Sequence, residues 1–317
     1  MCVANVAALD CGSNSTRLLI VDDHNQPLVR EMTITRLGQG VDDSGALSEA
    51  GIERVLTTLR RYRELMDTHD VTDGLLVATS AVRDAANGAE FFTRANAVVG
   101  VPARVISGDA EARYSFEGAT ASLSPSDTPT LIVDIGGGST ELASTIGGVL
   151  HGFSMQLGCV RVTERVLGTG MTTDQTLEQA RDMITAELDR AWAAVPAFAS
   201  LSNGVRVLGL AGTVATLAQL ETGLTSYRRD LVHHQTVTRD RLHHWVNVLG
   251  AMTPDERLMI PGMVAGRQDV MIAGLLIMDA VMERCGATSF ITSEDDILDG
   301  VATEVWRRNR ATPSIPR

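Results

Sequence analysis

Two short segments of the chain carry the residue types that bind phosphate and a hard cation. They read DCGSNSTRL from Asp10 and DIGGGSTEL from Asp134, and five of the nine positions are identical at a constant offset of 124 residues (134 − 10). Glycines lack a Cβ, so backbone N–H groups can approach an anion there, and a strand-end aspartate offers a hard oxygen to Mg²⁺. The alternative is a glycine hairpin whose aspartate satisfies its own turn. Two copies in register favour the binding interpretation.

The candidates in these segments fall into two groups. Asp10 and Asp134 are candidate metal-organising carboxylates. The candidate phosphate-binding residues offer backbone or hydroxyl donors, and they are Gly12, Ser13, Asn14, Ser15, Gly136, Gly137, Gly138 and Ser139.

A third candidate phosphate loop lies at GLAGTVATL, Gly209–Leu217. An expected strand meets Gly212 and Thr213 and then a helix N-terminus, where free N–H groups and the helix dipole favour an anion. The alternative is a tight packing turn. Glu111, at the start of an expected helix, is a candidate base that activates water, and the alternative is that it complements the helix dipole.

Three arginines have the planar fork that clamps phosphate oxygens: Arg17, Arg83 and Arg267. The alternative for each one is a surface ion pair. The histidine pairs at 233–234 and 243–244 suggest a metal site, but a hard-oxygen site does not require imidazole, so we expect surface or helix-packing roles for them.

The elements around these residues alternate between strands and helices. Ser48 should cap an amphipathic helix carrying Ile52 to Met66, and a second long helix should carry Leu177 to Trp192. The remainder after Gly212 reads as mainly helical. The expected strands are Val3–Leu9, Leu18–Val21, Leu75–Ala78, Val101–Ile106, Leu131–Val133, Leu142–Ile146, Val149–Phe153 and Val205–Leu210.

The repeat predicts a duplicated domain on either side of a linker at Ser122–Thr130. We therefore expect an α/β protein with domain I at 1–125 and domain II at 126–317, whose two Asp-x-Gly turns face one cleft.

The amino-acid composition excludes some reaction mechanisms and binding partners. All 27 basic residues of the 317 are arginine, which excludes a P-loop and Schiff-base chemistry, because both need a lysine. The formal net charge of −12 argues against wholesale nucleic-acid wrapping. Cys2, Cys11, Cys159 and Cys285 form no CxxC pair, which is typical of reduced thiols in the cytoplasm. The sequence shows neither a signal peptide nor a membrane span, so we expect no membrane association.

Eight motifs together resemble the exopolyphosphatase/guanosine pentaphosphate phosphohydrolase (Ppx/GppA) family. They run in order from about Val3 to about Gly300 and are DCGSNSTRL, RLGQGV, ATSAVRDAAN, ISGDAEAR, DIGGGSTEL, SMQLGCVRVTE, GLAGTVATLA and GRQDVMIAG. The resemblance implies two actin-like (ribonuclease H-like) domains of the actin, sugar kinase and heat-shock chaperone ATPase superfamily. Larger members continue into a helical HD-type domain, so this chain resembles the short, actinobacterial-type form.

The resemblance also implies roles for individual residues. Glu111 is the catalytic base, and Ala110 stands where relatives often have a second glutamate. Asp134 and Glu141 organise Mg²⁺ and water. The glycine turns and the segment at Gly212 bind phosphate, with Arg83 and Arg267, and Arg17 is a reasonable third arginine.

The expected function is magnesium-assisted hydrolysis of terminal phosphate from inorganic polyphosphate, with a preference for short chains because the extra domain is absent. Three alternatives stay open: guanosine pentaphosphate hydrolysis, a sugar- or acetate-type kinase, and a non-catalytic polyphosphate- or nucleotide-binding protein. A homodimer is plausible from the resemblance alone.

Overall fold

The computed structural model describes residues 5–124 and 126–311, so Cys2, the start of the first expected strand and Pro125 of the expected linker lie outside the described residues. The described chain forms two compact units. The first contains the residues up to Gly118 together with those from Ile297, and the second contains Ala119–Asp296.

The first unit is built on a five-stranded sheet in the order β3-β2-β1-β4-β5. β1, β2 and β3 pair antiparallel, whereas β4 and β5 run parallel to β1. The strands are β1 (Asn5–Cys11), β2 (Ser15–Val21), β3 (Pro27–Ile34), β4 (Val71–Ala78) and β5 (Ala103–Val105).

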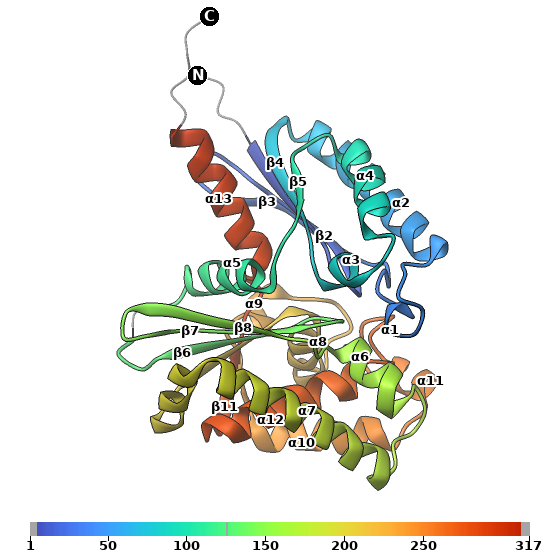
Figure 1. Cartoon of the computed structure of the whole chain (residues 1–317), viewed down its shortest axis with the longest axis vertical. Coiled ribbons are helices and arrows are strands. Elements are labelled where there is room, and N and C mark those ends of the chain that lie inside the picture. The colour runs from blue at the N-terminus through green and yellow to red at the C-terminus, as the bar shows by residue number, and fades with distance from the viewer. Residues whose placement is uncertain (1–4, 125, 312–317) are drawn as a thin grey trace, which may run out of the picture. The chain divides into compact units, whose positions relative to one another are not determined.

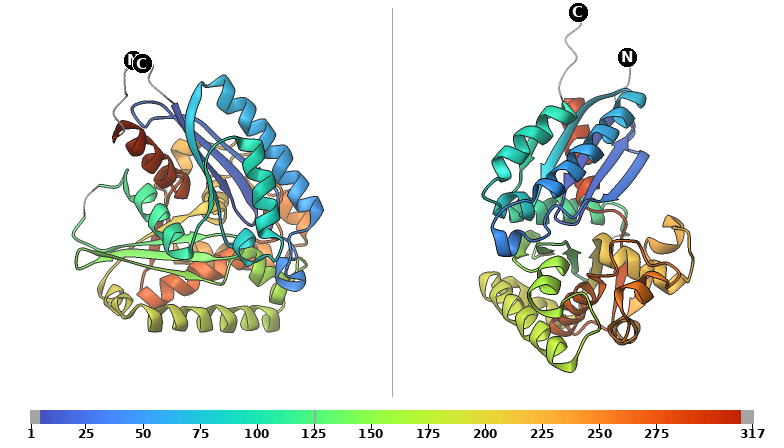
Figure 2. Two further views of the ribbon diagram at one scale, coloured as in Figure 1. Left: turned by 45° about the horizontal axis from the view of Figure 1, so that its top comes forward. Right: turned by 90° about the vertical axis from the view of Figure 1, so that its right-hand side faces the viewer.

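Helices cover both faces of this sheet, which explains why β1 is apolar along most of its length. α2 and α4 lie side by side on one face (Figures 1 and 2), and their Leu59 and Phe91 belong to the same buried cluster as Ala7 and Leu9 of β1. The helices are α1 (Val41–Ser44), α2 (Glu49–Thr68), α3 (Ser80–Asp84), α4 (Gly88–Val99), α5 (Gly108–Thr120) and α13 (Ile297–Ala311).

The C-terminal helix α13 packs on the other face of the first sheet. Val301 and Val305 share a core cluster with Val6 and Ala8 of β1. The sequence placed 126–317 in one domain, whereas the structure groups the chain from Ile297 with the first unit. The side chains of β1 are apolar on both faces of the sheet, so both faces must be buried. α2 and α4 bury one face and α13 buries the other.

The second unit contains a six-stranded sheet in the order β10-β11-β9-β6-β7-β8. Its strands are β6 (Thr130–Ile135), β7 (Thr140–Ile146), β8 (Val149–Met155), β9 (Arg206–Leu210), β10 (Thr236–Thr238) and β11 (Ser289–Thr292). Its helices are α6 (Cys159–Val162), the π-helix η1 (Thr163–Leu167), α7 (Asp174–Ala194), the 3₁₀-helix η2 (Pro196–Asn203), α8 (Ala211–Thr222), α9 (Arg229–Val232), α10 (Arg239–Gly250), α11 (Pro254–Leu258) and α12 (Met271–Cys285). α12 is apolar almost all round because it is buried in the core of this unit.

The two sheets share one topology. β6, β7 and β8 pair antiparallel, and β9 and β11 run parallel to β6, which repeats the pattern of β1 to β5. β10 adds an antiparallel edge strand. The duplication predicted from the repeat is therefore confirmed at the level of the fold, and each half has the ribonuclease H-like strand order of an actin-like domain.

Several local predictions are also confirmed. Ser48 caps α2 by accepting a hydrogen bond from the Gly51 amide at 3.2 Å. The expected strands match β1, β2, β4, β5, β6, β7, β8 and β9 within a few residues at most of their ends. β3 was not predicted, since its polar and half-exposed positions give no clear apolar pattern.

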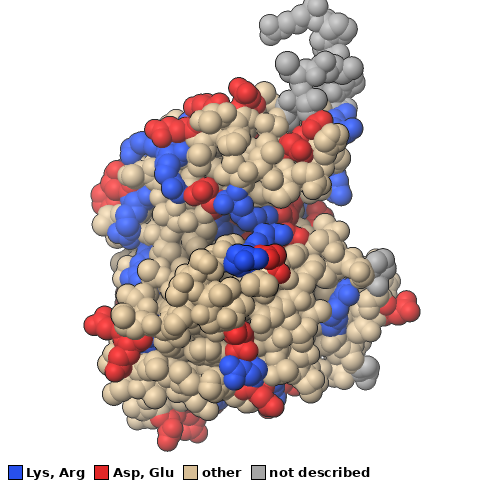
Figure 3. Space-filling view, turned by 180° about the vertical axis from the view of Figure 1, so that it is seen from behind, with Lys and Arg blue, Asp and Glu red and all other residues tan. Residues whose placement is uncertain are grey.

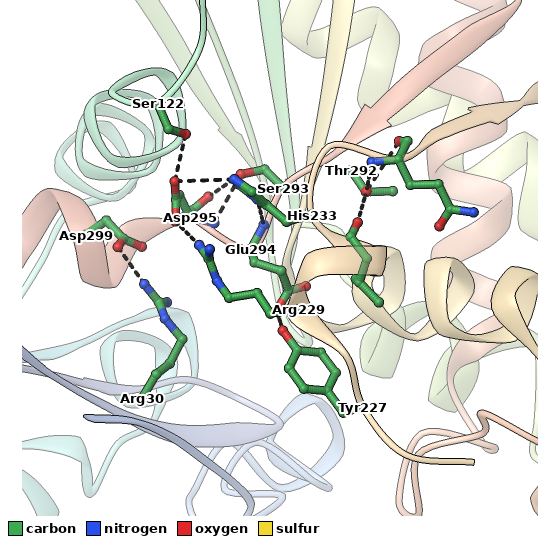
Figure 4. Close-up of polar contacts among 12 residues, drawn as sticks. Arg30, Ser122, Tyr227, Arg229, His233, Thr292, Ser293, Glu294, Asp295 and Asp299 are labelled. Carbon is green, nitrogen blue, oxygen red and sulfur yellow. Dashed lines mark hydrogen bonds and ion pairs between the residues drawn. The ribbon is translucent and has the colours of Figure 1, made fainter. Parts of the chain in front are cut away.

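A polar network in the second unit joins the residues around α9 to the segment between β11 and α13 (Figure 4). The Asp295 carboxylate accepts a hydrogen bond from Ser122 Oγ at 2.7 Å and pairs with Arg229. His233 Nε2 lies 3.7 Å from the same carboxylate, and its Nδ1 accepts from the Glu294 amide. This histidine therefore serves packing and hydrogen bonding.

Surface charges of both signs occur close together on the face shown in Figure 3. None of the helices in the described part of the chain is long and apolar enough to cross a membrane. Cys11, Cys159 and Cys285 are free and buried, and burial raises the pKa of each thiol. These three cysteines are therefore poor nucleophiles.

Candidate active site

The first glycine turn connects β1 to β2 and is held from behind by the segment after β3. The carbonyl of Ser13 accepts a hydrogen bond from the Gly38 amide at 2.7 Å, and that of Asn14 accepts from the Arg36 amide at 2.9 Å. Asn14 Nδ2 is buried and has no hydrogen-bond partner among the described residues. A buried donor without a partner is rare, so this one is suited to an anionic ligand.

Asp10, near the end of β1, and Arg17, near the start of β2, form an ion pair across this hairpin. They are directly opposite each other on β1 and β2. Nε and Nη2 of Arg17 donate to Asp10 Oδ2 at 3.0 and 2.7 Å, and Asp10 is only 2% exposed. The sequence assigned Asp10 to metal and Arg17 to phosphate, and the structure joins the two.

Arg83 and Glu111 also come together in the first unit. Arg83 Nη1 donates to the Ile106 carbonyl at 2.9 Å and lies 3.5 Å from Glu111 Oε2. Glu111 is buried in the first turn of α5, with its amide donating to the Ser107 carbonyl. Arg83 Nη2 is buried without a hydrogen-bond partner among the described residues. The pair thus offers an oriented carboxylate beside a spare guanidinium donor.

A hydroxyl pair links Arg83's helix to the glycine turn. Ser80, at the start of α3, has its Oγ 3.2 Å from Ser13 Oγ. The turn, α3 and the beginning of α5 therefore form one assembly at the carboxyl ends of β1 and β4.

The second glycine turn connects β6 to β7 and is packed against the start of α6. The amides of Cys159 and Val160 donate to the carbonyls of Gly136 and Gly137, both at 2.9 Å. A Cβ on Gly158 would lie 2.3 Å from the Gly137 oxygen, so only glycine fits there.

Sequence reasoning missed that a Leu-Gly pair supports each turn. Leu37-Gly38 follows β3 and Leu157-Gly158 follows β8, and the two pairs are 120 residues apart (158 − 38). A Cβ on Gly38 would lie 2.8 Å from Ser13 Cβ. The shared dipeptide was the available signal.

Asp134 and Glu141 are two buried carboxylates directly opposite each other on β6 and β7. They are 6% and 1% exposed, and opposite residues of an antiparallel pair project from the same face. Ser154 of β8 donates a hydrogen bond to Glu141 Oε1 at 2.7 Å. Thr140, beside the turn, has a buried Oγ1 with no hydrogen-bond partner within the described residues.

The third loop lies at the N-terminus of α8, beside β6. Ala211 has φ 67°, an unusual conformation for a residue with a Cβ, and the helix begins there. Buried Arg267 lies over Gly212, because a Cβ there would be 1.7 Å from the Arg267 Cζ. Burial raises the pKa of Cys159, and the charge of Arg267 opposes that rise. A helix N-terminus and a buried guanidinium together favour an anion.

The donor set of the second unit fits a small divalent cation. Mg²⁺ is commonly bound by one or two carboxylates and completes its coordination with water and substrate phosphate. Asp134 and Glu141 supply two hard oxygen ligands, and no described group of three or more His, Cys, Asp or Glu side chains forms an all-protein metal cage.

The predicted residues thus form two groups, one in each unit. The first unit holds Glu111 and the candidates Asp10, Gly12, Ser13, Asn14, Ser15, Arg17 and Arg83. The second holds Asp134 and Glu141 with Gly136, Gly137, Gly138, Ser139, Gly212, Thr213 and Arg267.

Comparisons with known proteins agree with this architecture. Residues 19–308 match the model of the Ppx/GppA phosphatase family. Exopolyphosphatase 2 of Mycobacterium tuberculosis is 37% identical over 95% of this chain and 98% of its own length. The crystal structure of an exopolyphosphatase-like protein has a TM-score of 0.89 at 32% identity, covering 96% of this chain and 100% of that one. A Ppx/GppA family member from Aquifex aeolicus gives 0.77 at 28% identity, covering 97% and 99%.

Proposed function

Because the chain belongs to the Ppx/GppA phosphatase family, we propose that it is an exopolyphosphatase that hydrolyses terminal phosphate from inorganic polyphosphate. The observation that carries the proposal is the placement of buried donors that have no hydrogen-bond partner among residues 5–124 and 126–311. Asn14 Nδ2, Arg83 Nη2 and Thr140 Oγ1 all belong to, or lie next to, segments expected to bind phosphate. A polyanionic substrate would give each of them an acceptor.

Glu111 is the proposed general base. Its carboxylate accepts a proton from water as the water oxygen attacks the terminal phosphorus, and the bond to the bridging oxygen breaks to release the shortened chain. Arg83, 3.5 Å from Glu111 and bound to the Ile106 carbonyl, holds that carboxylate in one orientation. Its spare Nη2 donor is available to a phosphate oxygen.

Asp134 and Glu141 are the proposed ligands of Mg²⁺, because they are buried, face the same side and offer only oxygen. When bound, the ion would neutralise charge on the transferred and leaving phosphates. Asp10 was expected to be a third metal ligand. We now assign it to Arg17 instead, because that guanidinium already supplies its counter-charge at 2.7 Å.

The glycine turns and arginines are the proposed phosphate binders. Backbone donors at Gly12–Ser15, Gly136–Ser139 and Gly212-Thr213, with Arg83 and Arg267, would stabilise the equatorial oxygens of the transferred group. Arg17 is not among these phosphate binders, because its guanidinium pairs with Asp10.

The preference for short chains, cytoplasmic location and a homodimer remain parts of the proposal. Buried free cysteines support a reducing compartment. The homodimer rests on the family resemblance alone, and light scattering of the purified protein tests it.

Phosphate release measured side by side on short polyphosphate, long polyphosphate, guanosine pentaphosphate and ATP tests the proposal. We expect magnesium-dependent release that is fastest on short polyphosphate. Glu111→Gln should lower kcat by about 10² to 10⁴ while substrate still binds. Release only from guanosine pentaphosphate, ATP-dependent transfer to an acceptor, or tight binding without release would each contradict it.

A further inference from the structure

A row of four residues crosses the second sheet at the level of Asp134. In strand order they are Leu210 of β9, Asp134 of β6, Glu141 of β7 and Ser154 of β8, each aligned with the next by sheet register. Ser154 Oγ donates to Glu141 Oε1 at 2.7 Å. The row therefore contains two buried acids and one hydroxyl but no basic side chain.

The duplication gives a built-in comparison in the first sheet. The equivalent row is Val77 of β4, Asp10 of β1, Arg17 of β2 and Met32 of β3. Arg17 stands where the second unit has Glu141, and Met32 stands where it has Ser154. This row neutralises its own aspartate, through hydrogen bonds of 3.0 and 2.7 Å from one guanidinium.

We propose that Ser154 is a positioning residue for the divalent cation, and that the row of the second unit binds this cation whereas the row of the first unit does not. The inference deepens the proposed function, because it rests on Asp134 and Glu141 being the metal ligands.

The orientation of the Glu141 carboxylate decides how well it can bind an ion. Glu141 has three side-chain torsions, and two carboxylates facing each other repel. A hydroxyl donor on Oε1 fixes the plane of the carboxylate and therefore the direction in which it would present oxygen to the ion. Loss of such an outer-shell partner typically weakens metal binding by about 10- to 100-fold. Met32 has no O–H to donate, which matches a row that needs no cation.

The role of Ser154 is tested by titrating the full chain with Mn²⁺ in the absence of substrate and measuring the bound ion by electron paramagnetic resonance. Ser154→Ala should raise the Mn²⁺ dissociation constant by about tenfold or more, and Ser154→Thr, which keeps the hydroxyl, should restore most of the affinity. Ser144→Ala is the matched control. Ser144 is a fully buried serine on β7, three residues from Glu141, so it projects from the opposite face.

Two further variants test the comparison between the rows. Asp134→Asn should abolish the bound Mn²⁺ signal, and Asp10→Asn should leave the affinity and a stoichiometry of one ion unchanged. Thermal unfolding with and without Mg²⁺ gives a second readout, since a ligand that binds the native state raises Tm.

The inference is overturned if Ser154→Ala binds Mn²⁺ like the unmodified protein, if Ser144→Ala weakens binding equally, or if Asp10→Asn weakens it as much as Asp134→Asn. It fails separately from the proposed function. Mn²⁺ binding that depends on Ser154 in a protein that releases no phosphate would support the inference and contradict only the exopolyphosphatase activity.

Discussion

Gly212 lies directly beneath the guanidinium of Arg267, so close that a Cβ on Gly212 would be 1.7 Å from Cζ and 1.8 Å from Nη2. The two residues come from different elements, the start of α8 and the segment before α12. Because Arg267 is itself buried, its side chain has little room to retreat. The glycine is therefore required by the position of the arginine, and the pair gives a direct test of Arg267.

Gly212→Ala should displace the Arg267 guanidinium by an ångström or more. A misplacement of that size in a phosphate-binding group costs about 10²-fold in rate. We expect kcat/KM for polyphosphate to fall accordingly, while the far-ultraviolet circular dichroism stays unchanged. Gly170→Ala is the control, because a Cβ there meets nothing within 4 Å. Equal activity of the two variants would remove Arg267 from phosphate binding.

Gly158→Ala should destabilise the second unit more than Gly38→Ala destabilises the first. At Gly158 the added Cβ would be 2.3 Å from the Gly137 carbonyl oxygen, which is backbone and cannot swing aside. At Gly38 the closest approach would be wider, at 2.8 Å from Ser13 Cβ, so less backbone displacement is needed. Overpacking of this kind costs about 1–3 kcal/mol. Urea unfolding measures both, and a larger loss for Gly38→Ala would contradict the backbone argument.

Sequence reasoning found the two Asp-x-Gly turns because their conformation admits few residue types. Asp10 and Asp134 stand at ends of the central strands of equivalent sheets, and the glycines after them are a signal that survives divergence. The Leu-Gly support of each turn was missed, although Gly38 and Gly158 repeat. The offset falls from 124 to 120 residues, and most of this change comes from the hairpin loop 22–26 before Gly38, which is three residues longer (5 − 2) than the Gly147-Gly148 turn before Gly158.

The sequence pattern did not predict which residues far apart in the chain contact each other. The apolar spacing of α13 shows that Val301 and Val305 face a core, but it does not say which sheet provides that core. Asp10 and Arg17 were both named as site residues, and only the β1–β2 register revealed that they pair. The apolar pattern and the turn residues set the elements, whereas register and tertiary packing decide which charges meet.

Arg257→Met should unfold the second unit at a lower urea concentration. Arg257 is 1% exposed, and its guanidinium donates to four backbone carbonyls, those of Leu249, Thr169, Gly170 and Gln268. Burial lowers the pKa of this arginine, and the charge of Asp269 opposes that effect. Leaving several of them unpaired should cost about 3 kcal/mol or more.

Arg257→Met should also lower catalytic activity. Arg257 binds the carbonyl of Gln268, the residue after Arg267, so losing this contact should shift the proposed phosphate-binding arginine. Arg257→Lys should recover little, since one ammonium cannot reach carbonyls from three segments. Arg181→Met, on the exposed side of α7, is the control and should change neither stability nor activity. A stability of Arg257→Met equal to that of the control would show that water replaces the guanidinium at no cost.

Glu304→Gln should remove part of the pH dependence of stability. Burial raises the pKa of Glu304, but a 2.7 Å hydrogen bond from Tyr114 and the charges of Arg104 and Arg113 outweigh it, so the native pKa lies below the ordinary value. A lowered carboxyl pKa contributes stability above the unfolded pKa, and that contribution is lost as the pH falls through the native one. The unmodified protein should therefore exceed Glu304→Gln by about 1 kcal/mol or less above about pH 5, because the side chain is partly exposed to solvent, and by progressively less as the pH falls below that toward pH 3. Urea unfolding across that range measures the difference, with Tyr114→Phe, alone and combined with Glu304→Gln, closing a double-mutant cycle. A difference that stays constant with pH would mean that packing of α13, and not the charge of Glu304, accounts for the loss.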